Sequence, residues 1–170
     1  MLIITIATQY NDTGLTPSTS YQHQIEAFND AGSTTSVRIA DNTSPGIPSG
    51  NISIQITGIT ATSVSLAWTA PSQPNGVIQH YIVICKKSSQ DPGTSYNMAL
   101  KTSAIIPNLN SFADYLFMVN ACTSAGCLSS KLVNAETSQA LPTGQSHPSI
   151  TAISSTALYV TWTPPDHPNG

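Results

Sequence analysis

The amino-acid sequence predicts an all-β protein built from repeated β-sandwich modules. Two observations lead to this fold class. Residue landmarks recur at a spacing of 94 positions along the 170-residue chain, and short segments of alternating apolar and polar residues are separated by proline and glycine. Alternation with a period of two places one set of side chains on one face of a strand. No window combines a helical period with capping residues, so we expect strands throughout.

The repeat aligns all of its landmarks in one register without a gap. Its length of 94 residues matches one β-sandwich domain, which takes about 100 residues, and exceeds the roughly 20–50 residues of a solenoid repeat. The recurring pairs are Leu15 with Leu109, Tyr21 with Tyr115, Gly32 with Gly126, Pro48 with Pro142, Trp68 with Trp162, and Pro71 and Pro74-Asn75-Gly76 with Pro165 and Pro168-Asn169-Gly170.

The alternation marks four strand segments within the complete repeat. Their apolar members are Ile52, Ile54 and Ile56, then Val64, Leu66 and Trp68, then Tyr81, Val83 and Cys85, and finally Tyr115, Phe117, Val119 and Ala121. Turn-forming residues separate these segments. They are Thr57-Gly58, Pro71–Gly76, Asp91–Gly93 and Thr123–Gly126.

Composition excludes two classes of partner. The formal net charge is −3 and only 8% of residues are charged, which is too sparse for the basic stripe that binds nucleic acid. No apolar run approaches the roughly 20 residues of a membrane span, so we expect no membrane insertion within this chain. The longest such run, Leu2–Ala7, has the length of one strand and lacks the features of a signal peptide. We therefore expect the protein to begin further upstream, with any targeting or anchoring segment elsewhere.

The order of landmarks in the complete repeat resembles the fibronectin type III module, an immunoglobulin-like β-sandwich. The residues that carry the resemblance are Pro48, Leu66-x-Trp68, Pro71, Tyr81-x-Val83, Leu109-x5-Tyr115, Val119-x-Ala121 and Gly126. The resemblance implies a division into three parts. Residues 1–44 would hold strands C′, E, F and G of a first module, residues 45–139 a complete seven-stranded module, and residues 140–170 strands A and B of a third.

The resemblance also assigns roles to the repeated aromatic residues. It implies that Trp68 and Trp162 lie in strand B and fill the core between the two sheets. It further implies that Leu15 with Tyr21, and Leu109 with Tyr115, form tyrosine corners, in which the phenol hydroxyl bonds to the backbone of the E–F turn. These residues would determine folding and say nothing directly about ligands.

Two of the three cysteines flank a predicted turn. Cys122 and Cys127 stand on either side of four residues between strands F and G, and directly opposed residues of an antiparallel pair lie within disulfide range. We therefore expect a disulfide, with two reduced thiols in a hairpin as the alternative. The first repeat carries Phe28 and Ser33 at these positions. Cys85 belongs to an inward-facing set and is expected to be a buried apolar side chain.

Three Asn-x-Ser/Thr sequons begin at Asn11, Asn42 and Asn51. Each is a glycosylation candidate, and Asn42 is the best of them because it lies in the predicted inter-module stretch 41–50. Together with a disulfide, the sequons favour the oxidising secretory route and an extracellular location. An intracellular array of similar modules is the alternative.

The sequence predicts no catalytic residue, cofactor or metal site. Its four histidines have no repeated partner, no carboxylate pair stands out, and nucleophile-elbow and phosphate-binding spacings are missing. Zinc would need four ligands at suitable spacing. An Arg-Gly-Asp loop and a Trp-Ser-x-Trp-Ser motif are also missing. Recognition could then sit only in the Pro71–Gly76 loop and the Cys122–Cys127 hairpin, unless the prolines simply stiffen a turn.

We therefore expect a structural and adhesive spacer array. Its partners would be extracellular-matrix or cell-surface proteins and neighbouring modules of the same chain. Proline-bearing linkers at Asn42–Pro48 and Thr137–Pro142 would limit bending without much contact between modules. The alternatives are receptor ectodomain modules that bind a protein through the loop tips, and accessory modules of a secreted enzyme. Residues 45–139 are expected to fold independently, with the end segments less protected because their strand edges are unpaired.

Overall fold

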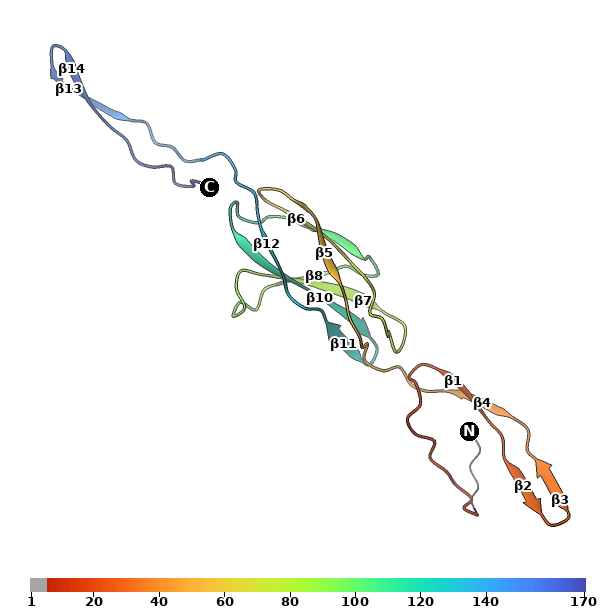
Figure 1. Cartoon of the computed structure of the whole chain (residues 1–170). Helices are drawn as coiled ribbons and strands as arrows, with labels where there is room; N and C mark the ends of the chain where they lie inside the picture. Colours follow the sequence, from red (N-terminus) through yellow and green to blue (C-terminus); the bar gives the residue numbers. More distant parts are fainter. Residues whose placement is uncertain (1–5) are drawn as a thin grey trace.

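The computed structural model describes residues 6–170, which form fourteen strands and no helix. Eight strands belong to the central sandwich, the name used here for residues 45–139. They are β5 (Ile54–Ile59), β6 (Val64–Trp68), β7 (His80–Lys86), β8 (Thr94–Asn97), β9 (Ser103–Ile106), β10 (Asp114–Thr123), β11 (Gly126–Ser129) and β12 (Val133–Glu136). The N-terminal segment (residues 6–44) and the C-terminal segment (residues 140–170) extend from opposite ends of this sandwich (Figure 1).

Two antiparallel sheets make up the central sandwich. One has the strand order β5-β6-β9, and the other has the order β11-β10-β7-β8, with β12 also paired to β10. Relative to a seven-stranded module, the first sheet contains strands A, B and E, and the second contains C′, C, F and G. Strand G is divided into β11 and β12. The predicted fold class, an immunoglobulin-like all-β sandwich, is confirmed.

The core lies between the sheets and follows the predicted period of two. Burial alternates along β6 and β7 and through most of β10. Phe117, Val119 and Val83 have no exposed surface, and Trp68 is only 5% exposed. The Trp68 and Tyr81 rings meet edge to face with centroids 5.9 Å apart, a geometry that aromatic quadrupoles favour. Strand B of one sheet thus packs directly against strand C of the other.

The N-terminal segment forms one long irregular hairpin. Its strands are β1 (Ser20–His23), β2 (Glu26–Asn29), β3 (Gly32–Thr35) and β4 (Ile39–Asn42). They pair as β1 with β4 and β2 with β3, so they correspond to strands F and G. Residues 9–19 form no strand, which contradicts the expected strand E. In the central sandwich E pairs with B, as β9 does with β6, whereas among the described residues no strand equivalent to B lies beside the N-terminal segment. The expected strand C′, which would open the chain, lies outside the described residues.

The C-terminal segment forms the expected A–B hairpin from β13 (Ser149–Ser154) and β14 (Ala157–Thr161). Trp162 follows β14 and is 70% exposed. The expectation that Trp162 fills a core is therefore wrong for this chain. The physical reason is that no second sheet faces this hairpin among the described residues, whereas β7 and β10 cover Trp68 in the central sandwich.

Tyrosine corners are present in both repeats. The Tyr115 hydroxyl accepts a hydrogen bond from the Asn110 amide at 2.9 Å, and the Tyr21 hydroxyl accepts one from the Thr16 amide at 2.8 Å. Tyr115 is buried in the central core, with Leu109 beside it in the same cluster. Tyr21 and Leu15, the residues of the first tyrosine corner, are only half-buried. The local bond therefore forms in both places, while core packing accompanies it only in the complete sandwich.

We predict that Phe117→Ala lowers the free energy of unfolding by about 3–5 kcal/mol, because it leaves a cavity between the sheets. Urea unfolding followed by circular dichroism provides the measurement. The matched control is Phe28→Ala, since Phe28 is 67% exposed and its removal should change stability by less than about 0.5 kcal/mol. Equal losses for the two variants would contradict the assigned core.

Removal of one hydroxyl tests the tyrosine corner. Tyr115→Phe should cost about 1 kcal/mol of unfolding free energy, because it leaves the Asn110 amide without its acceptor. Tyr21→Phe removes the same bond where solvent can replace it, so the amide exchange of Thr16 should rise while global stability stays constant. A global loss from Tyr21→Phe as large as that from Tyr115→Phe would contradict this assignment.

Candidate functional site

The F–G hairpin carries the only disulfide among the described residues. Strands β10 and β11 pair so that Cys122 lies opposite Cys127 and Thr123 opposite Gly126. The two cysteine Cα atoms are 4.0 Å apart and the sulfur atoms are bonded. Gly126 has φ 140, a backbone conformation that glycine adopts without steric cost, and it closes the short turn. The disulfide therefore pins the tip of this hairpin.

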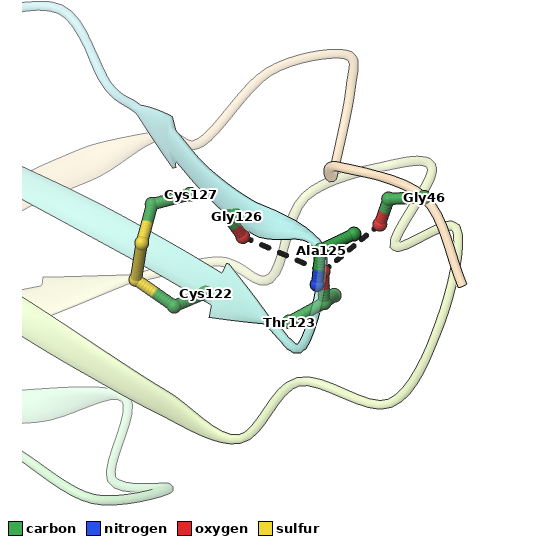
Figure 2. Close-up of a disulfide and its surroundings, with 6 residues drawn as sticks. All are labelled: Gly46, Cys122, Thr123, Ala125, Gly126 and Cys127. Atoms are coloured by element: carbon green, nitrogen blue, oxygen red, sulfur yellow. Dashed lines mark hydrogen bonds between the residues drawn. A yellow bond between two sulfur atoms is a disulfide. The ribbon is translucent and has the colours of Figure 1, made fainter. Parts of the chain in front are cut away.

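Thr123 links the pinned hairpin to the linker that precedes the central sandwich. Its hydroxyl donates a hydrogen bond to the Gly46 carbonyl at 2.9 Å and accepts one from the Ala125 amide at 3.2 Å. Figure 2 shows the bond to the Gly46 carbonyl beside the disulfide, together with a longer one, at 3.4 Å, from the Thr123 hydroxyl to the Gly126 carbonyl. Gly46 approaches the turn from a separate part of the chain. Thr123 is only 5% exposed, so its hydroxyl is satisfied by protein atoms rather than by solvent.

The B–C loop, Pro71–Gly76, holds the same linker through Asn75. The Asn75 side-chain amide donates to the Ile47 carbonyl at 2.8 Å and to the Ser49 hydroxyl at 3.1 Å. The Gly46 amide donates in turn to the Asn75 carbonyl at 2.8 Å. Asn75 has φ 54, a left-handed conformation that asparagine tolerates better than most residues. The B–C loop of the central sandwich therefore binds the linker of the same chain through hydrogen bonds from Asn75.

These bonds add detail to the expected linker. The proline-bearing stretch Asn42–Pro48 was expected to limit bending without much contact between modules. The structure bonds this stretch to both of its neighbours, since the Ser18 amide also donates to the Ser44 carbonyl at 3.1 Å. The signal in the sequence was the repeated Pro-Asn-Gly, but its partner atoms are backbone carbonyls, which any residue provides.

All three sequon asparagines, Asn11, Asn42 and Asn51, are exposed. Asn42 is the last residue of β4 rather than part of the linker, because the F–G hairpin pairs as far as Ser20 with Asn42. A strand end at the surface still leaves this side chain open to solvent. The geometry thus permits modification at each of the three positions.

Cys85 lies in the core and forms no disulfide. Burial, with a smaller contribution from the Asp91 carboxylate, raises the pKa of the Cys85 thiol to about 11. Hydrogen bonds from the backbone amides of Lys87 and Gly93, each 2.9 Å long, lower the pKa of the half-buried Asp91 carboxyl. A thiol that stays protonated at neutral pH is a poor nucleophile, so Cys85 acts here as an apolar side chain.

The remaining polar groups do not assemble into a reactive centre within the part of the chain that the structure describes. No three His, Cys, Asp or Glu side chains there gather closely enough to hold a metal ion. One pair that the sequence analysis missed joins His23 Nε2 to Asp12 Oδ2 at 3.0 Å, at the surface of the N-terminal segment. Between Ile6 and Gly170, no helix has the length and apolar character to cross a membrane.

Two comparisons place this geometry among known proteins. The sequence model of the Fibronectin type III domain matches residues 46–134, and the chain belongs to the fibronectin type III family. This domain is a non-catalytic module. The cysteine-bracketed hairpin at Cys122–Cys127 and the stretch Pro164–Gly170 further predict similarity to usherin. That prediction is confirmed, because the chain is 45% identical to usherin of Homo sapiens over 161 residues, which are 94% of this chain and 3% of usherin.

Other relatives show the same modules in different proteins. The chain is 34% identical to the phosphatidylinositol phosphatase PTPRQ of Homo sapiens, over 82% of this chain and 6% of that protein. It is 30% identical to neural cell adhesion molecule L1 of Takifugu rubripes, over 76% of this chain and 11% of that protein. The extracellular region of rat CD45, domains d3–d4, superposes with a TM-score of 0.68 at 17% identity, covering 81% of this chain and 74% of that d3–d4 chain. That last likeness shows the fold alone.

Loss of the disulfide should weaken the central sandwich. We predict that the double substitution Cys122→Ser with Cys127→Ser lowers the free energy of unfolding by about 2 kcal/mol, because the unfolded chain gains the entropy of an open loop. Urea unfolding of the two proteins measures this difference. Complete retention of stability in the double variant would contradict the assigned role.

Thiol counting supplies the control. In denaturant without reductant, alkylation should add one adduct, at Cys85, and three after reduction. In the folded protein Cys85 should react slowly even at pH 9, because its pKa of about 11 keeps the thiol protonated. Three adducts without reductant would show that the disulfide is missing.

Proposed function

We propose that the chain is a stretch of an extracellular structural and adhesive spacer array within a large usherin-like cell-surface or basement-membrane protein. Residues 1–44, 45–139 and 140–170 would be parts of three successive modules, with the middle one complete. The array would set the distance between other domains of the protein and its partners. Those partners would be extracellular-matrix or cell-surface proteins and neighbouring modules of the same chain.

The observation that carries this proposal is the end-to-end arrangement of the repeats. The N-terminal and C-terminal segments leave the central sandwich from opposite ends (Figure 1), so added modules lengthen the molecule. The loops that would bind a ligand in a receptor, the B–C loop and the F–G hairpin, instead bond to the linker through Asn75 and Thr123. This use of the loop tips favours a spacer over a receptor module.

Secretion is supported by independent features. The Cys122–Cys127 disulfide belongs to an oxidising compartment, and the relatives include a cell adhesion molecule. The likeness to usherin extends the proposal to fibrous links at basement membranes, hair-cell stereocilia and photoreceptors, and hence to hearing and vision. The accessory-module alternative receives no support from the 170 residues, since it depends on a catalytic domain elsewhere.

A secretion experiment tests the proposed location. Expressed behind a signal peptide in mammalian cells, the chain should leave the cell with the disulfide formed and with N-linked glycan on the exposed sequons. Mass before and after enzymatic glycan removal gives the measurement, and the matched control replaces Asn11, Asn42 and Asn51 with Gln. If the secreted chain carries no glycan and has three reactive thiols, the result would favour an intracellular array.

The same secreted material tests the spacer role. Small-angle X-ray scattering should give the profile of an elongated monomer, because each repeat extends the chain along one direction. A compact particle, with the end segments folded back on the central sandwich, would overturn the spacer proposal even if secretion succeeds.

A further inference from the structure

The first residues of the linker between the first two repeats are hydrogen-bonded to the preceding repeat. The Thr43 hydroxyl donates to the Thr16 carbonyl at 2.6 Å and accepts from the Thr19 amide at 3.1 Å. The Ser18 amide donates to the Ser44 carbonyl at 3.1 Å. Thr16–Thr19 belong to the E–F turn that the Tyr21 hydroxyl also binds. The first two linker residues are therefore fixed to the tyrosine corner of the N-terminal segment.

The last residues of the same linker are hydrogen-bonded to the following repeat. Both peptide groups of Gly46 are bonded to the central sandwich, the amide to the Asn75 carbonyl and the carbonyl to the Thr123 hydroxyl. The Asn75 side chain then holds the next carbonyl, that of Ile47. Only Pro45 stands between the two sets of bonds, and its ring already fixes φ. Little torsional freedom remains in this linker.

The second linker repeats this construction 94 residues later. The Thr137 hydroxyl donates to the Asn110 carbonyl at 2.7 Å, as Thr43 does to Thr16. The Ala140 amide donates to the Asn169 carbonyl at 2.9 Å, and the Asn169 side chain donates to the Leu141 carbonyl at 2.8 Å. Thr137 is only 2% exposed. The side-chain bonds of threonine (Thr43, Thr137) and asparagine (Asn75, Asn169) therefore recur in both linkers, which indicates that they belong to the repeat and not to one loop.

Backbone conformation supports this reading. Ser18 and Phe112, at equivalent positions of the two E–F turns, have φ 51 and 48. Such left-handed conformations cost energy for residues other than glycine and persist where the surroundings over-determine them. In both turns the amide of this residue donates to a linker carbonyl, that of Ser44 or Ser138. The linker bond thus accompanies the strained residue in each repeat.

Gly46 lies between the two repeats, with Pro17 on one side and Asn75 on the other. A Cβ atom on Gly46 would lie 3.0 Å from Cγ of Pro17 in the preceding repeat and 3.5 Å from Cβ of Asn75 in the following one. The first distance is too short for an unstrained contact, and the second is ordinary. A methyl group at this position would therefore be crowded by the preceding repeat, so the Pro17 ring would have to shift.

At the second junction the larger side chain lies in the linker and the smaller one in the E–F turn, the reverse of the first junction. Ala140 stands 94 residues after Gly46, and Ser111 stands 94 residues after Pro17. A methyl group is added in the linker where the larger proline ring is replaced by a serine in the E–F turn. Ser111 also lines a cleft between this E–F turn and the next B–C loop, with His167 and Asn169 on its other side. The two pairs thus conserve volume across the junction.

We propose that each junction is an interface that fixes the angle between consecutive modules. In it, threonine (Thr43, Thr137) binds the linker to the preceding module and asparagine (Asn75, Asn169) binds it to the following one. The pairs Pro17–Gly46 and Ser111–Ala140 set how closely the modules approach. The partner of this surface is the neighbouring module of the array, so the inference rests on the proposed spacer function.

Distance measurement in the whole 170-residue chain tests this interface. Spin labels attached to a noncanonical residue at exposed positions 33 and 95 leave the cysteines untouched, and double electron–electron resonance then reports the distance across the first junction. The unsubstituted chain should give one narrow peak. Gly46→Ala should shift or split that peak, because the methyl group meets the Pro17 ring. The double variant Gly46→Ala with Pro17→Ser copies the second junction and should restore a single narrow peak.

Two further variants distinguish the effect of the asparagine–linker hydrogen bonds from a loss of folding. Asn75→Ala removes the side-chain bonds to the Ile47 carbonyl and the Ser49 hydroxyl and keeps the bond of the Gly46 amide to the residue 75 carbonyl. It should broaden the distribution, and because the linker then opens more often, the Gly46 amide should exchange about fivefold faster, as expected for roughly 1 kcal/mol of lost linker stability. Asn169→Ala removes the equivalent side-chain bond from the other junction and should leave the measured distance unchanged. Amide protection of Phe117 and Val83, which lie in the core, should stay constant in all variants and shows that the sandwich is folded.

The outcomes distinguish this inference from the spacer proposal. A broad distribution in the unsubstituted chain, or a peak that Gly46→Ala leaves in place, overturns the fixed junction. A flexible array would still be secreted and elongated on average, so the spacer function would survive that result. Failure of the double variant to restore the peak would overturn the assigned size pairing.

Discussion

The closed hydrophobic layer between the two sheets is the constraint on which the rest of the structure depends. Phe117, Val119 and Val83 lose all contact with solvent only because strands from both sheets face each other. Such burial is the main favourable term in folding. Where only one hairpin is present, as at β13 and β14, the same sequence pattern leaves Trp162 largely exposed. Alternation alone therefore specifies a strand face, and only a second sheet turns that face into a core.

The tyrosine corner connects the core to the ends of the module. Leu109 and Tyr115 belong to the buried cluster, and the Tyr115 hydroxyl orders the E–F turn through the Asn110 amide. The carbonyl of the same Asn110 accepts the Thr137 hydroxyl. A short series of contacts and hydrogen bonds, through Tyr115 and Asn110, thus joins the core to Thr137, the first residue of the next linker. A spacer array gains from this arrangement, because the stability of each module also orders its connection.

The disulfide and the B–C loop act on the other side of each linker. Cys122 and Cys127 pin the hairpin beside Thr123, whose hydroxyl binds Gly46. Asn75 binds the adjacent peptide groups from a loop that contains two prolines. The disulfide and the two prolines restrict the backbone of these elements, which reduces the conformational entropy lost when they hold the linker. The loop tips that serve recognition in many sandwich proteins are used here for internal connection.

The sequence by itself determined the fold class, the family and the repeat, because periodic burial and rare turn residues are local signals that repetition reinforces. It also located the pairing of Cys122 with Cys127 from the predicted hairpin. Only the tertiary structure decided the exposure of Trp162, the missing strand E of the N-terminal segment, and the hydrogen-bonded linkers. Each of these depends on contacts between residues far apart in the chain, such as Thr123 with Gly46. Their acceptors are backbone carbonyls, which carry no signature in the amino-acid sequence.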